Sequence, residues 1–209
     1  MENNYSKKVS ATLLAIYVVL FSILAINPFD RSVWFAENMT IIPIVVFLII
    51  LWFRGVRFSS LSYVLMSVLI FMHTIGGHYT FERVPFDAVS QAFGFARNNY
   101  DRIGHFAVGF YAFPIMEYLR SRSIVKTKIQ AGFFALCIII SVAAVYELFE
   151  WWYAVNSDPT AGLAVLGSQG DIWDAQKDML SDTLGGIFAV LLFFGISNRK
   201  SNLIQADRS

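Results

Sequence analysis

Six long apolar runs constrain the fold of this 209-residue chain more than any other feature. They cover about 10–26, 36–53, 60–78, 103–119, 129–154 and 178–197. Most reach the roughly 20 residues that an α-helix needs to cross a hydrocarbon core of about 30 Å. Hydrophobic residues form 56% of the chain, more than a soluble domain of this length can bury. The sequence predicts an all-α protein, a polytopic bundle of six transmembrane helices in one integral membrane domain over 1–209.

The first two runs are the least straightforward to interpret as spans. The first run follows two lysines, as a signal peptide would, but no small-x-small cleavage site precedes Asn27. We therefore expect the first run to be retained as a span. The second run carries Glu37, Asn38 and Pro43 near its start, which makes it the least regular of the six.

The basic residues indicate the orientation of the bundle, because Lys and Arg favour cytoplasmic loops. With both termini inside, eleven of the sixteen Lys and Arg residues lie on the cytoplasmic face and five on the other. This predicts an N-in, C-in topology. The net charge of +1, without a basic run, predicts no nucleic-acid partner, so membrane lipids are the expected partners. No pattern indicates an oligomeric state.

Ten ionisable residues, including all three histidines, lie at or near the ends of these runs that should face outward. They are His73, His78, Asp101, His105, Glu147, Glu150, Asp171, Asp174, Asp178 and Asp182. Ionisable groups at membrane depth are costly and mark functional sites by default. We expect them to converge on one layer near the outer interface.

Asp101 and His105 are four residues apart, so a helix that begins near Asp101 places both on one face. One interpretation is a capping acid beside a buried, hydrogen-bonded histidine. The other is a carboxylate that orients an imidazole, which acts as metal ligand or general base.

His73 and His78 are about 140° apart on a regular helix, so they do not form a ligand pair on one face. Gly76 and Gly77 between them offer two alternatives. The glycines end the helix and turn His78 back toward His73, or His73 faces the bundle while His78 lies in the headgroup region.

The remaining acids fall into two groups. Glu147 and Glu150 share a helix face, and two close carboxylates in a low-dielectric site require a cation or a proton. The second group forms one acidic stripe that runs into the last span: Asp171, Asp174, Asp178 and Asp182. A metal could neutralise these acids, as could Lys177, Arg97 or Arg102. Gly185 and Gly186, just beyond the stripe, would let another helix approach closely.

Imidazole nitrogen and carboxylate oxygen are donors that suit zinc or iron. The predicted metal ligands are His73, His78, His105, Asp174, Asp178 and Asp182. The predicted catalytic groups are Glu147, Glu150 and Asp101. The first hypothesis is metal-assisted hydrolysis or transfer on a lipid or lipid-linked envelope substrate at the outer leaflet. The alternatives are non-enzymatic: binding or transport of a cation, a proton or a cationic headgroup, or a polar network that only fixes helix packing.

Four segments resemble motifs of the YjdF-type bacterial inner-membrane proteins. They are HTIGGHYTFERVPF (73–86), RNNYDRIGHF (97–106), YELFEWW (146–152) and GSQGDIWDAQKDM (167–179). A weaker likeness to VanZ-like proteins rests on the Asp-Arg-x-x-His-Phe segment at 101–106, on Glu147 and on the segment 178–186. VanZ-like proteins are associated with resistance to glycopeptide antibiotics, which act at the cell-envelope surface. The resemblance implies an inner-membrane location and a multi-pass topology, and no particular reaction.

Overall fold

The computed structural model describes residues 2–206 and the side chains of residues 4–198, and every regular element in this part of the chain is helical. The longer helices are α1 (Glu2–Leu24), α2 (Arg31–Phe53), α3 (Ser60–Tyr79), α5 (Tyr100–Val108), α6 (Ala112–Ser121), α7 (Lys128–Asn156) and α9 (Asp174–Ala206). The short helices are η1 (Phe81–Arg83), α4 (Asp87–Phe93), η2 (Gly109–Tyr111) and α8 (Pro159–Leu166).

Five of these helices are long and apolar enough to cross a membrane: α1, α2, α3, α7 and α9. They correspond to five of the six runs that the sequence marks as spans. Four of the runs lie wholly within a helix, and the first, 10–26, extends two residues past the end of α1 at Leu24. The prediction of an all-helical, multi-pass bundle is therefore confirmed.

The fourth expected span, 103–119, is not one regular helix. The chain is helical from Tyr100 to Ser121, but it is divided into α5, the 3-10 turn η2 and α6. Pro114 gives the physical reason, because proline has no N–H and its ring clashes with the carbonyl four residues earlier, that of Phe110. Phe110 lies in the middle of η2. Six regular spans are thus not confirmed.

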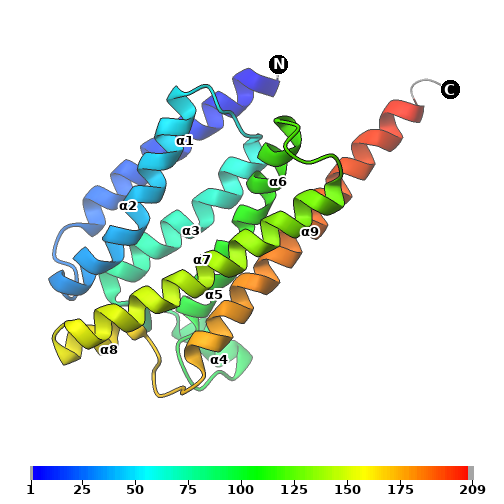
Figure 1. The fold of residues 1–209 in the computed structure, drawn as a ribbon. Helices are drawn as coiled ribbons and strands as arrows, with labels where there is room; N and C mark the ends of the chain where they lie inside the picture. Colours follow the sequence, from blue (N-terminus) through cyan, green and yellow to red (C-terminus); the bar gives the residue numbers. More distant parts are fainter. Residues whose placement is uncertain (1, 207–209) are drawn as a thin grey trace.

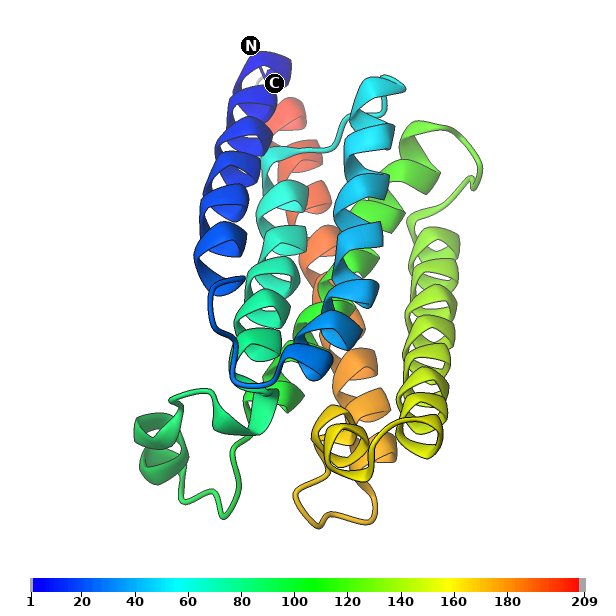
Figure 2. The same cartoon turned by 90° about the vertical axis from the view of Figure 1, so that its left-hand side faces the viewer.

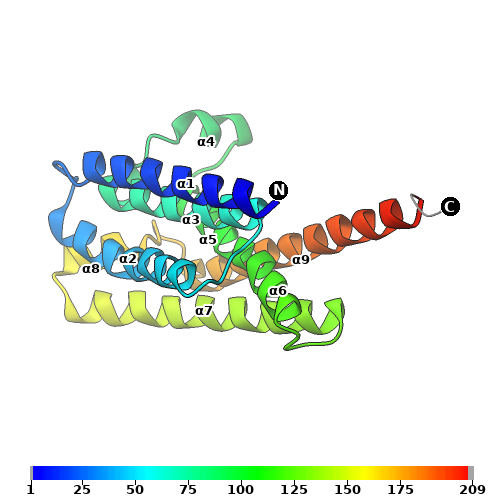
Figure 3. The same ribbon diagram turned by 90° about the horizontal axis from the view of Figure 1, so that it is seen from above.

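The long helices lie side by side in an elongated bundle (Figure 1). The first turn of α1 and the last turns of α9 lie at one end, while α4 and α8 lie at the other (Figure 2). Seen from above, α4 lies beyond α1 and α3, and α7 runs along the opposite side of the bundle (Figure 3). The bundle therefore has two distinct ends, one with the chain termini and one with the short helices.

Glycines bring α5 and η2 against α9. A Cβ on Gly185 would lie 1.9 Å from the Phe106 carbonyl oxygen, and one on Gly109 would lie 2.1 Å from the Gly186 nitrogen. The predicted close approach at Gly185 and Gly186 is confirmed. Backbone contact at this point sets the side chains of α5 directly opposite the first turns of α9.

Candidate functional site

A small cavity of about 90 Å³ lies in the half of the bundle nearest α4 and α8. Helices α2, α3, α5, α7 and α9 all contribute to its wall. Its polar lining consists of Thr40, His73, Asp101, His105, Tyr146 and Asp182, and the rest of its wall is apolar or glycine. The sequence predicted that ionisable groups from several spans converge in one layer, and the structure places six of the ten around this cavity or beside His105.

His105 is the centre of this group. Its Nδ1 lies 3.1 Å from Asp182 Oδ2, and its Nε2 lies 3.7 Å from Asp101 Oδ1 and 4.0 Å from Glu147 Oε1. His105 and Asp182 are both buried, with side chains 6% and 1% exposed. One imidazole is thus surrounded by carboxylates from α5, α7 and α9.

The local sequence explains how α5 presents His105. Asn99 occupies the N-cap position and Asp101 lies in the first turn. A negative charge there interacts favourably with the positive end of the helix dipole. The 3.7 Å separation between Asp101 and His105 confirms that both lie on one helix face.

A second imidazole–carboxylate pair lies across the cavity. His73 Nε2 is 3.1 Å from Glu37 Oε2, 3.1 Å from the Glu37 carbonyl oxygen and 3.0 Å from Thr40 Oγ1. Glu37 and Thr40 are not among the site residues predicted from the sequence. The available signal was a lone acid inside an apolar run, three residues before a threonine.

Tyr146 stands between the two histidines. Its ring centroid lies 6.4 Å from that of His73 and 5.8 Å from that of His105, and its hydroxyl donates a 3.5 Å hydrogen bond to Glu37 Oε2. Glu150, one turn further along α7, is buried at 7% exposure and also interacts with Tyr146. Tyr146 therefore connects two polar clusters that no sequence spacing relates.

Three side chains have the spacing of a metal site. One ligand atom each from Asp101, His105 and Asp178 lies within 4.8 Å of the other two. In addition, Asp182 Oδ1 and Glu147 Oε1 are buried and have no hydrogen-bond partner in the described part of the chain. Nitrogen and oxygen donors of this kind suit zinc or iron.

The outermost aspartates are matched by basic side chains. Arg97 Nη1 donates to Asp174 Oδ1 at 2.5 Å, and Arg102 donates to Asp174 and, at 3.0 Å, to Asp178 Oδ1. Lys177 Nζ donates to Asp171 Oδ2 at 2.6 Å, and this hydrogen bond lowers the pKa of the Asp171 carboxyl below its usual range. Arg97, Arg102 and Lys177 are thus the cations that pair with this segment, while Asp178 also lies close to Asp101 and His105.

His78 does not join the other histidines. α3 continues through Gly76 and Gly77 to Tyr79, and the His78 Nδ1 donates to the Leu24 carbonyl oxygen at 2.7 Å. The Phe29 amide in turn donates to the His78 carbonyl at 2.8 Å. His78 thus secures the α1–α2 turn, while His73 faces the bundle. The helix does not end at the glycines, so the first alternative, in which His78 turns back toward His73, is wrong.

Comparison with known proteins agrees with the membrane fold. A family model described as "Predicted membrane protein (DUF2238)" matches residues 9–199. The Escherichia coli (strain K12) protein named "Inner membrane protein YjdF" is 34% identical over 182 residues, which covers 86% of this chain and 83% of that protein. No solved structure matches. The match runs from the first long helix to the last, so the chain belongs to the DUF2238 family and is a multi-pass protein of the bacterial inner membrane.

Proposed function

We propose that this protein binds a divalent cation, zinc or iron, beside His105 and uses it in hydrolysis or group transfer on a lipid or lipid-linked substrate. The observation that carries the proposal is the excess of buried acid around one imidazole. Asp101, Glu147 and Asp182 lie within 4.0 Å of His105, yet two of their oxygens have no donor. Buried charges in proteins are paired or coordinate a metal, so a cation at this point would satisfy the cluster.

The proposed ligands are Asp101, His105 and Asp178, whose donor atoms are already close together. Asp182 holds the Nδ1 side of the His105 ring, which is the usual arrangement of a carboxylate behind a metal-binding histidine. His105 Nε2, which lies toward Asp101 and Glu147, is then available to the ion. His73, which the sequence predicts as a ligand, is not in this set. It lies across the cavity, where its Nε2 contacts Glu37.

Glu147 is the proposed general base. Its Oε1 is buried, has no hydrogen-bond partner among the described residues and lies 4.0 Å from His105 Nε2. A carboxylate in this position can take a proton from a water molecule held in the cavity beside the cation. Glu150 lies one turn behind it, next to Tyr146, and would assist through that hydroxyl.

The position of the cavity supports an amphiphilic substrate. Ile44 of α2 and Val142 of α7 form part of its wall, and the neighbouring Val46 and Val145 are 47% and 66% exposed on the outer surface of the bundle. A polar headgroup could reach the cavity while its acyl chains stay in the bilayer. The segments that resemble VanZ-like proteins contain the same residues, Asp101, His105, Glu147 and Asp178.

We further propose six crossings with both termini in the cytoplasm. In this topology α5, η2 and α6 together form the fourth crossing, 22 residues broken at η2. Two observations support it. The start of α1 and the end of α9 lie at the same end of the bundle (Figure 2), and most Lys and Arg residues belong to the termini and loops on that side. The His105 cluster would then face the extracytoplasmic side. A periplasm-active reporter fused after Arg122 should be inactive, and an active fusion would overturn this orientation.

A second function, proton or cation handling without chemistry, is favoured by one observation. Tyr146 lies between the His73–Glu37 and His105–Asp182 pairs, so titratable groups extend across the cavity from α2 to α9. Intramembrane chains of this kind carry protons in pumps and transporters. Such a role needs no bound metal, which separates it from the first proposal.

Metal analysis of the purified protein tests the first proposal. Wild type and His78→Ala should each carry zinc or iron, while His105→Ala should have lost it. His78→Ala is the matched control because it removes an imidazole that lies outside the cavity. A metal-free wild type would favour proton handling. Lipid extracts of cells that carry only Glu147→Gln should accumulate the substrate, and an unchanged lipid profile would argue against an enzyme.

A further inference from the structure

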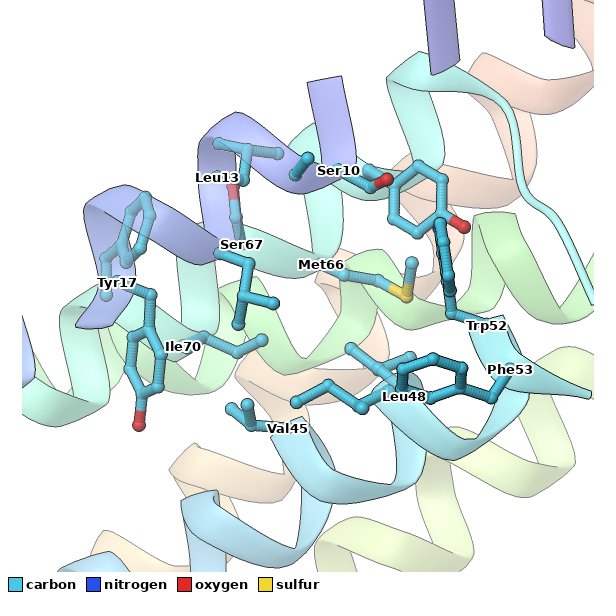
Figure 4. Close-up of a pocket in the computed structure, with 15 residues that line it drawn as sticks. Ser10, Leu13, Tyr17, Val45, Leu48, Trp52, Phe53, Met66, Ser67 and Ile70 are labelled. Atoms are coloured by element: carbon cyan, nitrogen blue, oxygen red, sulfur yellow. The ribbon is translucent and has the colours of Figure 1, made fainter. Parts of the chain in front are cut away.

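A second cavity, of about 260 Å³, lies in the opposite half of the bundle and shares no lining residue with the first. Figure 4 shows that α1, α2 and α3 surround it with side chains that include Leu13, Val45, Leu48, Met66 and Ile70. α1 and α2 each pack against α3, which forms the floor between them. The cavity is a groove rather than a sealed void, because Leu14 and Phe53 in its wall are 39% and 78% exposed.

The chemistry of the wall selects an apolar occupant. Apart from the hydroxyls of Ser10, Tyr17, Tyr63 and Ser67 and the Trp52 indole, the lining side chains carry no polar group. Ser10 and Ser67 already donate to the carbonyls of Lys7 and Val64. The other polar groups, those of Tyr17, Tyr63 and Trp52, are few among fifteen lining side chains, so most of the wall offers water no hydrogen-bond partner. Left empty, the groove would lose the dispersion contacts of its lining. At this depth in a bilayer, the apolar material available to fill it is an acyl chain.

Positive charge surrounds the end of the groove where α1 begins and α2 ends. Lys7 and Lys8 lie within the turn before Ser10, and Arg54 and Arg57 follow the lining residues Trp52 and Phe53. The Arg57 guanidinium lies over the Trp52 ring, with Cζ 4.2 Å from its centroid. Four basic residues at an apolar opening complement a phosphate group at the level of the lipid headgroups.

Contacts at this end hold the basic residues in place. Ser6 Oγ donates to the Phe58 carbonyl at 2.6 Å, which ties the first turns of α1 to the α2–α3 loop. Among the residues whose side chains the structure describes, the acid on this side is Glu117, which accepts hydrogen bonds from the Ser59 amide at 2.7 Å and from the hydroxyls of Ser59 and Ser62. Glu117 is therefore committed to the start of α3 and leaves the positive charge of the opening in place.

We infer that the groove between α1, α2 and α3 is a binding site for one acyl chain of an anionic phospholipid. The phosphate of that lipid is held by the basic residues at the opening, Lys7, Lys8, Arg54 and Arg57. The site is separate from the His105 cluster and lies at the other end of the bundle, so its lipid is a resident partner rather than the proposed substrate.

Native mass spectrometry of the detergent-purified protein tests this inference, with phosphatidylglycerol and phosphatidylcholine of equal chain length as probes. Wild type should bind one phosphatidylglycerol at least about tenfold more tightly than phosphatidylcholine. Equal binding of the two lipids would overturn the role of the basic residues.

Val45 and Val46 supply a matched pair of variants, because only Val45 lines the groove while Val46 faces outward. Val45→Trp should weaken the phosphatidylglycerol adduct by about tenfold, and Val46→Trp should leave it unchanged. Ser67→Leu narrows the same groove from α3 and should act like Val45→Trp, which guards against a variant that fails to fold. Equal adducts in all of these variants would overturn the site.

Arg57→Gln should reduce phosphatidylglycerol binding, with Arg122→Gln as its control. Arg122 also lies over an aromatic ring, that of Tyr118, but it follows α6, a helix that contributes no residue to the wall of the groove. An equal loss in both variants would show general attraction of an anionic lipid to a basic surface and would contradict the site.

Discussion

His105 and Asp182 are 77 residues apart in the chain, yet His105 Nδ1 lies 3.1 Å from Asp182 Oδ2. The contact depends on α5 and α9 meeting backbone to backbone at Gly185, one turn beyond Asp182. It fixes the ring so that Nε2 lies toward Asp101 and Glu147. The close packing of α5 against α9 therefore also orients the His105 ring in the site.

Substitution of Gly185 should separate these helices. A Cβ there would lie 1.9 Å from the Phe106 carbonyl oxygen, and backbone cannot yield as a flexible side chain does. Gly185→Ala should lower the free energy of unfolding by about 3 kcal/mol and weaken metal binding. Gly195→Ala is the control, since its Cβ would meet open space on the same helix. Thermal unfolding in detergent measures both variants, and equal melting temperatures would refute the close packing.

Asp182→Asn should weaken the metal site without removing a proposed ligand. The amide has nearly the same shape as the carboxylate but loses the charge that holds Nδ1 of His105. Loss of such an orienting partner typically reduces metal affinity by about 10–100-fold. Competition with a chromophoric zinc chelator measures the affinity. Asp171→Asn, which alters the acid paired with Lys177, should leave it unchanged, and an equal effect of both variants would contradict the role of Asp182.

Arg102 should be important for stability, because it donates to two buried acids, Asp174 and Asp178. Arg102→Gln leaves both carboxylates with less positive charge and should destabilise the protein by about 3 kcal/mol. Arg83→Gln removes an arginine that is 54% exposed, pairs with Glu82 and lies over the exposed Phe29 ring, so its effect should stay below about 1 kcal/mol. Chemical unfolding of the two variants compares them, and similar losses would show that Arg102 is not specially engaged.

Acid should loosen the start of α2, the helix that carries Glu37. Hydrogen bonds from the Ser32 hydroxyl and the Val33 amide lower the pKa of the Asp30 carboxyl, which caps this helix. A lowered folded-state pKa means that the stabilisation is complete above the unfolded value of about 3.9 and is lost as the pH falls through the folded value.

The amide-exchange protection factors of residues 32–34 should therefore fall in wild type below about pH 4. Asp30→Asn keeps a capping side chain without a titratable group, so its protection should not change over the same range. A parallel fall in both proteins would show that Asp30 does not control the cap.

The spans were predictable because lipid requires long apolar helices, and the convergence of His73, His105 and Asp182 followed from the positions of these residues at span ends. The interruption at η2 was harder to predict, because a hydropathy profile measures only how apolar a segment is. It does not show that Pro114 lacks an amide donor and that its ring crowds the Phe110 carbonyl. Hydropathy alone therefore predicts a span here more regular than the one that forms.

The partners within the site were not predictable from spacing. Glu37 meets His73, and Tyr146 lies between His73 and His105, because of the order and rotation of α2, α3, α5 and α7 in the bundle. The pairing of Arg97 and Arg102 with the outer aspartates also depends on how the loops fold back. Helix periodicity fixes neighbours on one helix and leaves neighbours on different helices undetermined.

Equilibrium dialysis of metal-depleted protein against zinc is the most direct test of the proposed centre. Wild type in lipid nanodiscs should bind one zinc ion per chain, as should His78→Ala, whose imidazole donates to the Leu24 carbonyl outside the cavity. A variant that combines Asp101→Asn with His105→Ala should bind none. Full zinc binding by that double variant, or none by wild type, would contradict a metal centre at His105.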